Sequence, residues 1–327
     1  MKLVLCIPHK RKLWQVPAWF APRLRVEFPD VEVVELSSYD ELDEAIVDAD
    51  VLMAWSIRKE QFVKAKRLKW IHCPAAAVHN LVIPEVVASD VVVTNSSEVH
   101  GATVAEHVIA LMLSLAKRLH RARDFQSESE WGLDAMLAET PLGRVVKGET
   151  VTVIGMGEIG SNTARLAKCL GMRVLGVRAH PDVPDVSADK MYALDNLDDA
   201  LRESDFVVVA APVTARTNRM MNAARFALMK PDAYVINVAR GSLVDTEALL
   251  AAIHEKKIGG AALDVFDEEP LPPDSPIWMT REILVTPHSA GVNENLWDLH
   301  YELLSENIRR HKNGKPLRGI VEKEKGY

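Results

Sequence analysis

Three side chains in the second half of the chain, Arg240, Glu269 and His288, have the chemistry needed to polarise and protonate a carbonyl group. An arginine holds a carboxylate through a planar pair of charge-assisted hydrogen bonds. A histidine donates a proton to a carbonyl oxygen, and a carboxylate beside it orients the ring. Each of the three lies at or just after the end of a predicted β-strand, where open α/β sheets form their ligand sites.

Taken singly, each of these positions also has a plain structural explanation. An arginine at a strand end is commonly a solvated charge, Glu268-Glu-Pro270 is an ordinary loop, and Thr286-Pro-His288 can cap a strand. Their joint position downstream of a glycine-rich stretch favours the functional interpretation.

The glycine-rich stretch is Val151–Gly160, in which a β-branched apolar run is followed by three glycines and then by a helical pattern. A strand that runs through G-x-G-x-x-G into a helix is the dinucleotide-binding fingerprint. We expect Gly155 to make the tight turn, Gly157 to admit the pyrophosphate, and Gly160 to let helix and strand pack closely. The start of the helix then offers unpaired N–H groups to the anion.

The end of the next strand indicates which dinucleotide is bound. NAD-binding folds generally place an Asp or Glu there, about 20 residues after the glycines, to bond the ribose 2′-hydroxyl. This chain has Arg178 instead, with His180 two residues later. An arginine matches a 2′-phosphate, so we predict NADP(H), with NAD(H) as the second choice. The alternative is that Arg178 stacks on adenine or points to solvent.

These residues need a framework of strands, and the apolar pattern supplies it. Strands that alternate with helical segments predict parallel sheets covered by helices. We therefore expect an α/β protein with two Rossmann-like, doubly wound parallel-sheet domains and a cleft between them. The expected strands are 3–7, 31–36, 51–54, 70–72 and 91–94, and then 151–154, 172–177, 206–210, 234–237, 260–264 and 283–286.

Three further segments connect or extend these domains. Residues 101–120 form a long apolar helical pattern, which we interpret as a buried connector. Residues 121–149 are polar and irregular, which predicts an extended arm whose Trp131 packs against the body of the protein or against a second subunit. A last helix is expected over 293–312.

Composition argues against several classes of partner and compartment. The formal net charge is −7 and the basic residues are dispersed, so nucleic acid is not the expected partner. Cys6, Cys73 and Cys169 lack metal-ligand spacing, and we interpret them as buried thiols in a reducing compartment. The N-terminal apolar run is too brief for a signal peptide, and the apolar helix around 108–116 is too short to cross a bilayer. We therefore expect a cytoplasmic protein without a metal.

The chain closely resembles the D-isomer-specific 2-hydroxyacid dehydrogenase family over nearly its whole length. The motifs that carry the resemblance are Trp70-Ile-His-Cys-Pro-Ala-Ala-Ala-Val78, Val104-Ala-Glu-His107, Gly155-Met-Gly-Glu-Ile-Gly160, Asn237-Val-Ala-Arg-Gly241, Asp264-Val-Phe-Asp-Glu-Glu-Pro270 and Thr286-Pro-His288. By position, the resemblance implies that Arg240 binds the carboxylate and carbonyl of the substrate. It also implies that His288 is the acid/base and Glu269 its partner.

The resemblance further implies a substrate loop and a division into domains. The backbone N–H groups of Ala76, Ala77 and Val78 would bind the substrate carboxylate, and Trp55 would contact the substrate or simply pack in its domain. Many relatives have glycine where this chain has Ala77, so we expect a different loop geometry and pocket size. The implied domains are a discontinuous flavodoxin-like substrate-binding domain, 1–98 with 292–327, and a dinucleotide-binding Rossmann domain, 99–291.

The resemblance also implies other contacts with the cofactor. Asp264 and the backbone near Ala239 would hold the nicotinamide carboxamide, although Asp264 is equally suited to be a cap or a salt-bridge partner. A homodimer is also implied. The complete set of implied cofactor-binding residues is Thr103, Gly155, Met156, Gly157, Glu158, Ile159, Gly160, Arg178, His180, Ala211, Pro212, Thr217, Val238, Ala239, Asp264, Ser289 and Gly291.

We therefore predict an oxidoreductase that moves hydride between NADPH and C2 of a small 2-keto acid such as glyoxylate or hydroxypyruvate. Two alternatives stay open. One is an NAD-linked dehydrogenase of the phosphoglycerate type, against which Arg178 and the lack of an appended regulatory domain count. The other is a non-catalytic, NAD(H)-sensing protein of the corepressor type, against which the lack of long disordered tails counts.

Overall fold

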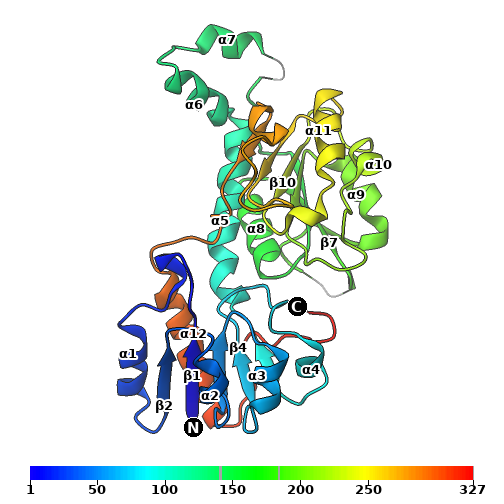
Figure 1. Ribbon diagram of the computed structural model, residues 1–327. Coiled ribbons are helices and arrows are strands. Elements are labelled where there is room, and N and C mark those ends of the chain that lie inside the picture. The colour runs from blue at the N-terminus through cyan, green and yellow to red at the C-terminus, as the bar shows by residue number, and fades with distance from the viewer. Residues whose placement is uncertain (140–141, 183–184, 327) are drawn as a thin grey trace. The chain divides into compact units, whose positions relative to one another are not determined.

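The computed structural model describes residues 1–139, 142–182 and 185–326 and divides the chain into two compact units (Figure 1). Unit 1 comprises Met1–His100 with Asn293–Tyr327, and unit 2 comprises Gly101–Val292. Each unit has its own parallel sheet with helices on both faces, which confirms the predicted α/β class with two doubly wound sheets.

The sheet of unit 1 has the strand order β2-β1-β3-β4-β5, and all its pairings are parallel. This is the order of flavodoxin-like sheets, whose ligand sites lie beyond the carboxyl ends of the strands. Each strand begins and ends within one residue of its predicted bounds. The strands are β1 (Lys2–Cys6), β2 (Glu32–Leu36), β3 (Val51–Ala54), β4 (Trp70–His72) and β5 (Val92–Thr94).

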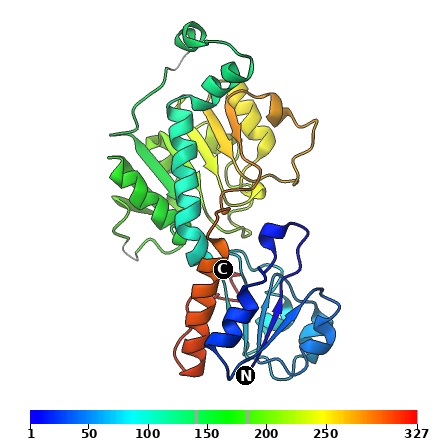
Figure 2. The same ribbon diagram turned by 90° about the vertical axis from the view of Figure 1, so that its left-hand side faces the viewer.

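The helices of unit 1 are α1 (Phe20–Glu27), α2 (Leu42–Ala45), α3 (Lys59–Lys64), α4 (Pro84–Val87) and α12 (Leu296–Lys312). Successive side chains of a strand point to opposite faces of the sheet, so the sheet has two cores. One core packs Leu3 and Leu5 against α1 and α12, and the other packs Val4 and Cys6 against α2, α3 and α4. Figure 2 shows α12 beside α1, so the last helix completes the fold of the first residues.

The sheet of unit 2 has the strand order β12-β11-β10-β9-β6-β7-β8, again with every pairing parallel. Counted from β6, this is the 3-2-1-4-5-6 order of dinucleotide-binding folds, with β12 as one more strand at the edge. The strands are β6 (Thr150–Ile154), β7 (Arg173–Arg178), β8 (Lys190–Ala193), β9 (Phe206–Val209), β10 (Tyr234–Asn237), β11 (Gly260–Leu263) and β12 (Ile283–Val285). Edge strand β8 was not predicted, because it buries Tyr192 alone and lacks an apolar run.

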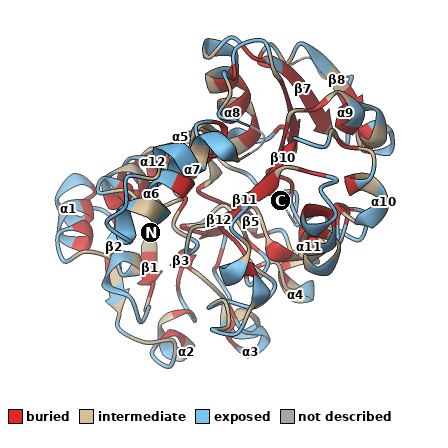
Figure 3. Ribbon diagram, turned by 90° about the horizontal axis from the view of Figure 1, so that it is seen from above, coloured by how far each residue is buried: buried red, intermediate tan, exposed pale blue. Residues whose placement is uncertain are grey.

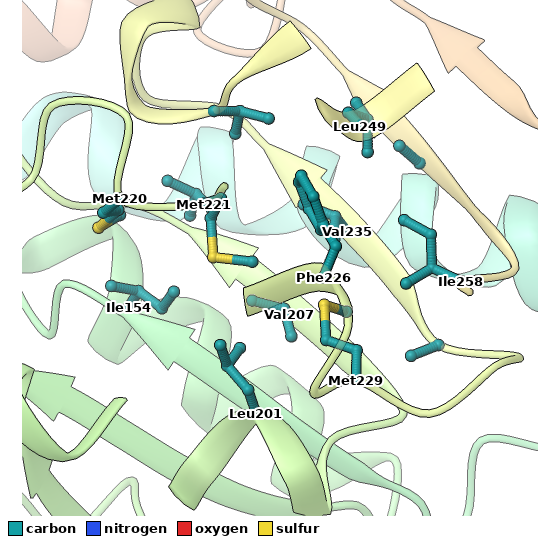
Figure 4. Packing of buried hydrophobic residues seen from close by; sticks show 14 of the residues in the cluster. Ile154, Leu201, Val207, Met220, Met221, Phe226, Met229, Val235, Leu249 and Ile258 are labelled. Atoms are coloured by element: carbon teal, nitrogen blue, oxygen red, sulfur yellow. The ribbon is translucent and has the colours of Figure 1, made fainter. Parts of the chain in front are cut away.

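The main helices of unit 2 are α5 (Ser97–Ala116), α8 (Glu158–Cys169), α9 (Leu197–Glu203), α10 (Ala223–Phe226) and α11 (Thr246–His254). On one face of the sheet, side chains such as Val207, Phe226 and Leu249 interlock beneath α9, α10 and α11 (Figure 4). The other face packs against α5 and α8. Figure 3 shows β7 and β10 in red, because strands of a parallel sheet are buried on both faces.

Helix α5 corrects one expectation and bears out another. At 20 residues, with a mean hydropathy of 1.4 over its most apolar window, it is long and apolar enough to cross a membrane, so the expectation that it is too short is wrong. However, 56% of that window is buried inside the protein, and Val108 and Met112 are fully buried against the sheet of unit 2. Its apolar character therefore belongs to a core helix.

The arm after α5 is more regular than expected. It contains α6 (Leu119–Ser127) and α7 (Leu133–Ala138), and buried Arg121 ties them together through a 2.8 Å ion pair with Glu139. Both helices lie away from the sheet of unit 2 (Figures 1 and 2). Trp131 is 90% exposed, so it does not pack against the body of its own chain.

The cysteines also differ in one respect from expectation. Cys6 and Cys73 are buried, and burial raises the pKa of each thiol to about 12. Cys169 is exposed, because it ends α8 on the side facing solvent. Among the described residues there is no group of three or more His, Cys, Asp or Glu side chains placed to hold a metal ion.

Candidate active site

His288 and Glu269 form a close pair in unit 2. Nδ1 of the imidazole lies 2.6 Å from Oε2 of Glu269, and Oε1 accepts a hydrogen bond from the backbone N–H of Phe266 at 3.0 Å. Because a carboxylate is only an acceptor, Nδ1 carries the hydrogen of this bond. Nε2 is then the nitrogen left for another partner, and the side chain of His288 is 49% exposed.

Arg240 follows β10 and is half-buried. Its Nη1 donates to the carbonyl of Ala239 at 2.6 Å. Burial lowers the pKa of the guanidinium, and the charge of Glu269 acts in the opposite direction. Arg240 and the His288–Glu269 pair both lie on loops of unit 2.

Two neighbouring residues hold the Arg240 loop in place, and neither was predicted as a site residue. The buried amide of Asn237 accepts from the N–H of Ala239 at 3.1 Å and donates to the carbonyl of Arg240 at 2.8 Å. Gly241 permits a close approach, since a Cβ there would lie 2.1 Å from the carbonyl carbon of Phe266. The loop carrying Arg240 thus lies directly against the loop that leads to Glu269.

Asp264 organises the turn that carries His288. It is 1% exposed, and Thr286 Oγ1 and the N–H of Ser289 donate to its Oδ1 at 2.6 and 2.9 Å. The N–H of Ala290 donates to Oδ2 at 3.1 Å. These bonds stabilise a backbone in which His288 has φ 52°, a left-handed conformation unfavourable for a non-glycine residue. Asp264, which follows β11, thus caps the turn that follows β12.

The glycine turn has the geometry that a dinucleotide needs. Gly155 has φ +96°, and a Cβ there would lie 2.6 Å from the carbonyl oxygen of Ala210. A Cβ on Gly160 would lie 1.9 Å from the oxygen of Gly155, so α8 packs tightly on the turn. A Cβ on Gly157, in contrast, would meet nothing within 4 Å. This open space lies at the N-terminus of α8, where a pyrophosphate can meet unpaired N–H groups.

A pocket of about 390 Å³ adjoins this turn at the end of β7. Arg178 and Arg165 contribute positive charge to its wall, and Asp185 contributes negative charge. The carboxylate of Asp185 accepts hydrogen bonds from the hydroxyl of Ser161, at 2.9 Å, and from Ser187. Burial alone would raise the pKa of Asp185, but these hydrogen bonds outweigh it and the pKa is lowered. His180 is exposed, and its carbonyl accepts from Arg178 Nε at 3.1 Å.

In unit 1, the loop after β4 presents backbone donors. The N–H groups of Ala76, Ala77 and Val78 have no hydrogen-bond acceptor within the described part of the chain. Successive backbone N–H groups without an acceptor of their own are suited to binding an anion. Ala77 is not among the described non-glycine residues with positive φ, so alanine fits this loop without backbone strain.

Trp55 also lies in unit 1, just after β3. Its ring stands edge-on to Trp14, with 6.4 Å between the ring centroids. The indole nitrogen is buried and has no hydrogen-bond partner among the described residues. The ring contact fits domain packing, whereas the unpartnered indole nitrogen leaves a contact with a ligand open.

The other implied cofactor residues gather at the carboxyl ends of the strands of unit 2. Thr217 donates to the carbonyl of Pro212 at 2.7 Å and so shapes the loop after β9. Thr103 lies on α5 instead. The residues after the strands are Ala211 and Pro212 after β9, Val238 and Ala239 after β10, and Ser289 and Gly291 after β12.

Comparison with known proteins agrees with this geometry. Residues 109–290 match the model of the NAD binding domain of the D-isomer specific 2-hydroxyacid dehydrogenases. The chain belongs to this family. The matched segment lies within unit 2, so the cofactor domain of this dehydrogenase is the unit that carries the glycine turn.

Relatives with named activities include two kinds of enzyme. This dehydrogenase is 36% identical over 293 residues to a glyoxylate reductase of Thermococcus onnurineus, covering 88% of this chain and 87% of the relative. It is 31% identical over 306 residues to a D-3-phosphoglycerate dehydrogenase of Methanocaldococcus jannaschii. That match covers 92% of this chain but 57% of the relative, so the chain spans little more than half of its length.

A solved structure shows the same fold. The NADPH-dependent glyoxylate/hydroxypyruvate reductase of Sinorhizobium meliloti, in complex with NADP and sulfate, matches with a TM-score of 0.80 and 25% identity. The match covers 100% of this chain and 99% of that one. This dehydrogenase is therefore an oxidoreductase whose relatives act on small 2-hydroxy or 2-keto acids.

Proposed function

We propose that this 2-hydroxyacid dehydrogenase reduces a small 2-keto acid, such as glyoxylate or hydroxypyruvate, to the D-2-hydroxy acid with NADPH. The observation that carries the proposal is the 2.6 Å pair of His288 and Glu269, whose loop lies against the loop that carries Arg240. A proton donor and a guanidinium together suit a substrate that has a carboxylate next to a carbonyl. The glyoxylate reductase relative supports the choice of substrate class.

Each residue has a separate task in this reaction. Arg240 and the N–H groups of Ala76 to Val78 bind the substrate carboxylate, and Arg240 also polarises the carbonyl. His288 gives the proton on Nε2 to the carbonyl oxygen, while Glu269 orients the ring and stabilises its charged form. The bound nicotinamide supplies the hydride that C2 receives. General acid catalysis of this kind typically contributes about 10²–10⁴-fold to the rate.

The proposed cofactor is NADP(H). The turn at 155–160 and the N-terminus of α8 would hold the pyrophosphate, and Asp264 with the backbone near Ala239 would hold the carboxamide. Arg178 would bind the 2′-phosphate, with Arg165 in the wall of the same pocket. The NADPH-dependent relative with a bound NADP supports this preference.

We also propose that the protein is a cytoplasmic homodimer. Trp131, Leu133 and Leu137 of the arm are 90%, 51% and 59% exposed, and clustered apolar side chains of this size mark an interaction surface. The occupant we propose is the arm region of a second copy. Buried free thiols at Cys6 and Cys73 fit a reducing compartment.

A kinetic panel tests the proposed reaction. Oxidation of NADPH and of NADH is followed with glyoxylate, hydroxypyruvate, pyruvate and bulkier 2-keto acids. We expect turnover of at least one small keto acid and a higher kcat/KM with NADPH. Equal efficiency with the two cofactors, or a preference for NADH, contradicts the cofactor proposal. No turnover with any keto acid contradicts the reaction and favours a cofactor sensor.

A further inference from the structure

The carbonyl groups of the loop after β4 are held by donors from within unit 1. Three consecutive carbonyls are bound in this way, each by a different residue of the buried framework. The N–H of Ser96 donates to the carbonyl of Ala75 at 2.9 Å, and Nδ2 of Asn95 donates to the carbonyl of Ala76 at 2.9 Å. The thiol of Cys73 donates to the carbonyl of Ala77 at 3.4 Å.

These bonds fix the direction of the N–H groups of the same loop. In a trans peptide the C=O of one residue and the N–H of the next lie in one plane and point in opposite directions. A bound Ala75 carbonyl therefore turns the N–H of Ala76 away from the framework. In the same way, the bound carbonyl of Ala76 turns the N–H of Ala77 away from the framework. The bound carbonyl of Ala77 does so for the N–H of Val78. The donors of the anion site are thus aimed by bonds made to the preceding carbonyls.

Asn95 makes the only one of these bonds that comes from a full-strength side-chain donor. Its Oδ1 accepts the backbone N–H of Ser97 at 3.2 Å, which leaves Nδ2 to face Ala76. Its own N–H donates to the carbonyl of Gly319 at 2.8 Å, and the residue is 7% exposed. The amide is therefore held from two sides, and its orientation is determined.

We propose that Asn95 is a positioning residue for keto acid binding, because its amide sets the plane of the Ala76–Ala77 peptide and aims the Ala77 N–H at the substrate carboxylate. This proposal rests on the proposed function of the loop. It makes Asn95, which lies outside the loop, the residue that sets the geometry of the loop. The hydrogen bond from Asn95 also explains why the loop can have alanine at position 77. The bond fixes the peptide plane, so no residue with a left-handed conformation is needed.

The neighbouring residue anchors the same framework. The hydroxyl of Ser96 donates to the carbonyl of Cys73 at 3.1 Å, and ring nitrogens of His72 and His300 lie 3.2 and 3.1 Å from the hydroxyl oxygen. Because the hydroxyl hydrogen is used on Cys73, both rings act as donors to Ser96. The segment of Asn95 and Ser96 is therefore held in place by the buried hydrogen bonds that Ser96 makes with Cys73, His72 and His300.

The variant Asn95→Ser separates the two bonds of this side chain. A serine hydroxyl can still accept the N–H two residues later, as serine does in such turns, but it is too short to reach Ala76. We expect the KM for the keto acid, and the inhibition constant of the unreactive analogue oxamate, to rise about 10- to 100-fold through loss of an aimed bond to a charged group. The kcat at saturating keto acid and the dissociation constant of NADPH should stay within about 3-fold of the parent.

Ser305→Ala is the matched control, because Ser305 is a buried serine of unit 1 on α12 whose hydroxyl makes no bond to the loop. It should leave KM and oxamate inhibition unchanged. A folded Asn95→Ser enzyme with unchanged KM and oxamate inhibition overturns the inference, as does an equal loss of kcat and NADPH affinity.

Binding measured without turnover separates this inference from the proposed reaction. Calorimetric titration with oxamate is carried out on both full-length chains in the presence of NADPH. If the parent reduces no keto acid but binds oxamate more tightly than Asn95→Ser, the positioning role stands and the reaction fails. If the parent binds no oxamate, the loop is not a carboxylate site and both proposals fail. If Asn95→Ser does not fold, Asn95→Asp is used, where the second carboxylate oxygen faces the Ala76 carbonyl and the same rise in KM is expected.

Discussion

Nδ1 of His288 lies 2.6 Å from Oε2 of Glu269, and this contact leaves Nε2 as the nitrogen available for the proton transfer that we propose. We expect His288→Ala to lower kcat by about 10²–10⁴-fold, because the proton then comes from water. Glu269→Gln removes the charge that stabilises the imidazolium and should lower kcat by a smaller factor. Steady-state rates with the best keto acid, together with NADPH titrations by fluorescence, measure both effects. Unchanged turnover in His288→Ala would show that another group is the acid.

Asp264 is expected to matter for stability as well as for activity. In Asp264→Ala, the N–H groups of Ser289 and Ala290 lose their acceptor, and an unsatisfied buried donor costs about 1–3 kcal/mol. We expect the free energy of unfolding to fall by about 2–4 kcal/mol and kcat to fall with it, because the His288 turn loses its support. Urea denaturation and steady-state kinetics measure the two quantities. The control is Asp267→Ala, which removes an exposed carboxylate of the same loop; an equal effect in the control argues against a special role for Asp264.

The strands that support this site could be predicted because the apolar composition of their sequences indicates that they are buried. Continuous apolar runs such as Val51–Ala54 and Phe206–Val209 have the composition of strands covered on both faces, and the structure places β3 and β9 there. Edge strand β8 and the arm helices α6 and α7 carry no such signal. Arg121 is polar in sequence, yet it is buried by its ion pair with Glu139, a contact between residues far apart in the helical pattern.

The chemical groups of the site could be identified by type, but their supports could not. Arg240, Glu269 and His288 follow strand ends, and this position is visible in the sequence. Asn95 acts on Ala76, 19 positions away, through a bond that depends on the register of β4 and β5. No periodicity or spacing encodes such a contact, so it emerges only from the folded chain.

The cofactor pocket should respond oppositely to two charge changes. Arg178→Ala removes a cation expected to pair with the 2′-phosphate and should lower the ratio of kcat/KM for NADPH to that for NADH by about 10-fold or more. Asp185→Asn removes a negative charge from the same pocket and should raise that ratio. Arg202→Ala, which removes an exposed arginine paired with Asp199, serves as the control. If Arg178→Ala leaves this ratio unchanged, other residues determine the preference for NADPH over NADH.

The arm is expected to carry the dimer contact. Trp131→Lys places a charge where a 90% exposed indole is available for burial, and aromatic residues at interface centres commonly contribute 2 kcal/mol or more. We expect the dimer dissociation constant to rise about 30-fold or more, as measured by sedimentation velocity over a range of concentrations. Val26→Lys changes an 83% exposed residue of α1 and should leave the dimer intact. A monomeric parent, or a Trp131→Lys dimer of full strength, contradicts the assignment.

Acid should destabilise unit 1 through three buried histidines. Burial lowers the pKa of His72 to about 3, lowers that of His100, and lowers that of His300 well below its usual value with further contributions from His100 and His72. Above pH 6.5 these rings are neutral in both the folded and the unfolded chain. As the pH falls below 6.5, the unfolded chain takes up protons that the folded chain does not, so the free energy of unfolding decreases. For His72 this loss continues until about pH 3.

The expected loss between pH 6.5 and 5.5 is about 1 kcal/mol for His72, and His100 and His300 act in the same direction. Urea denaturation at closely spaced pH values measures it. In His72→Asn the free energy of unfolding should depend less steeply on pH, because the contribution of one histidine is removed. This holds even if the variant is less stable at every pH. His254→Gln removes an exposed histidine from α11 and should leave the slope of the parent unchanged. A slope in His72→Asn equal to that of the parent would mean that His72 is protonated in the folded chain, because only a ring that stays neutral on folding makes stability depend on pH in this range.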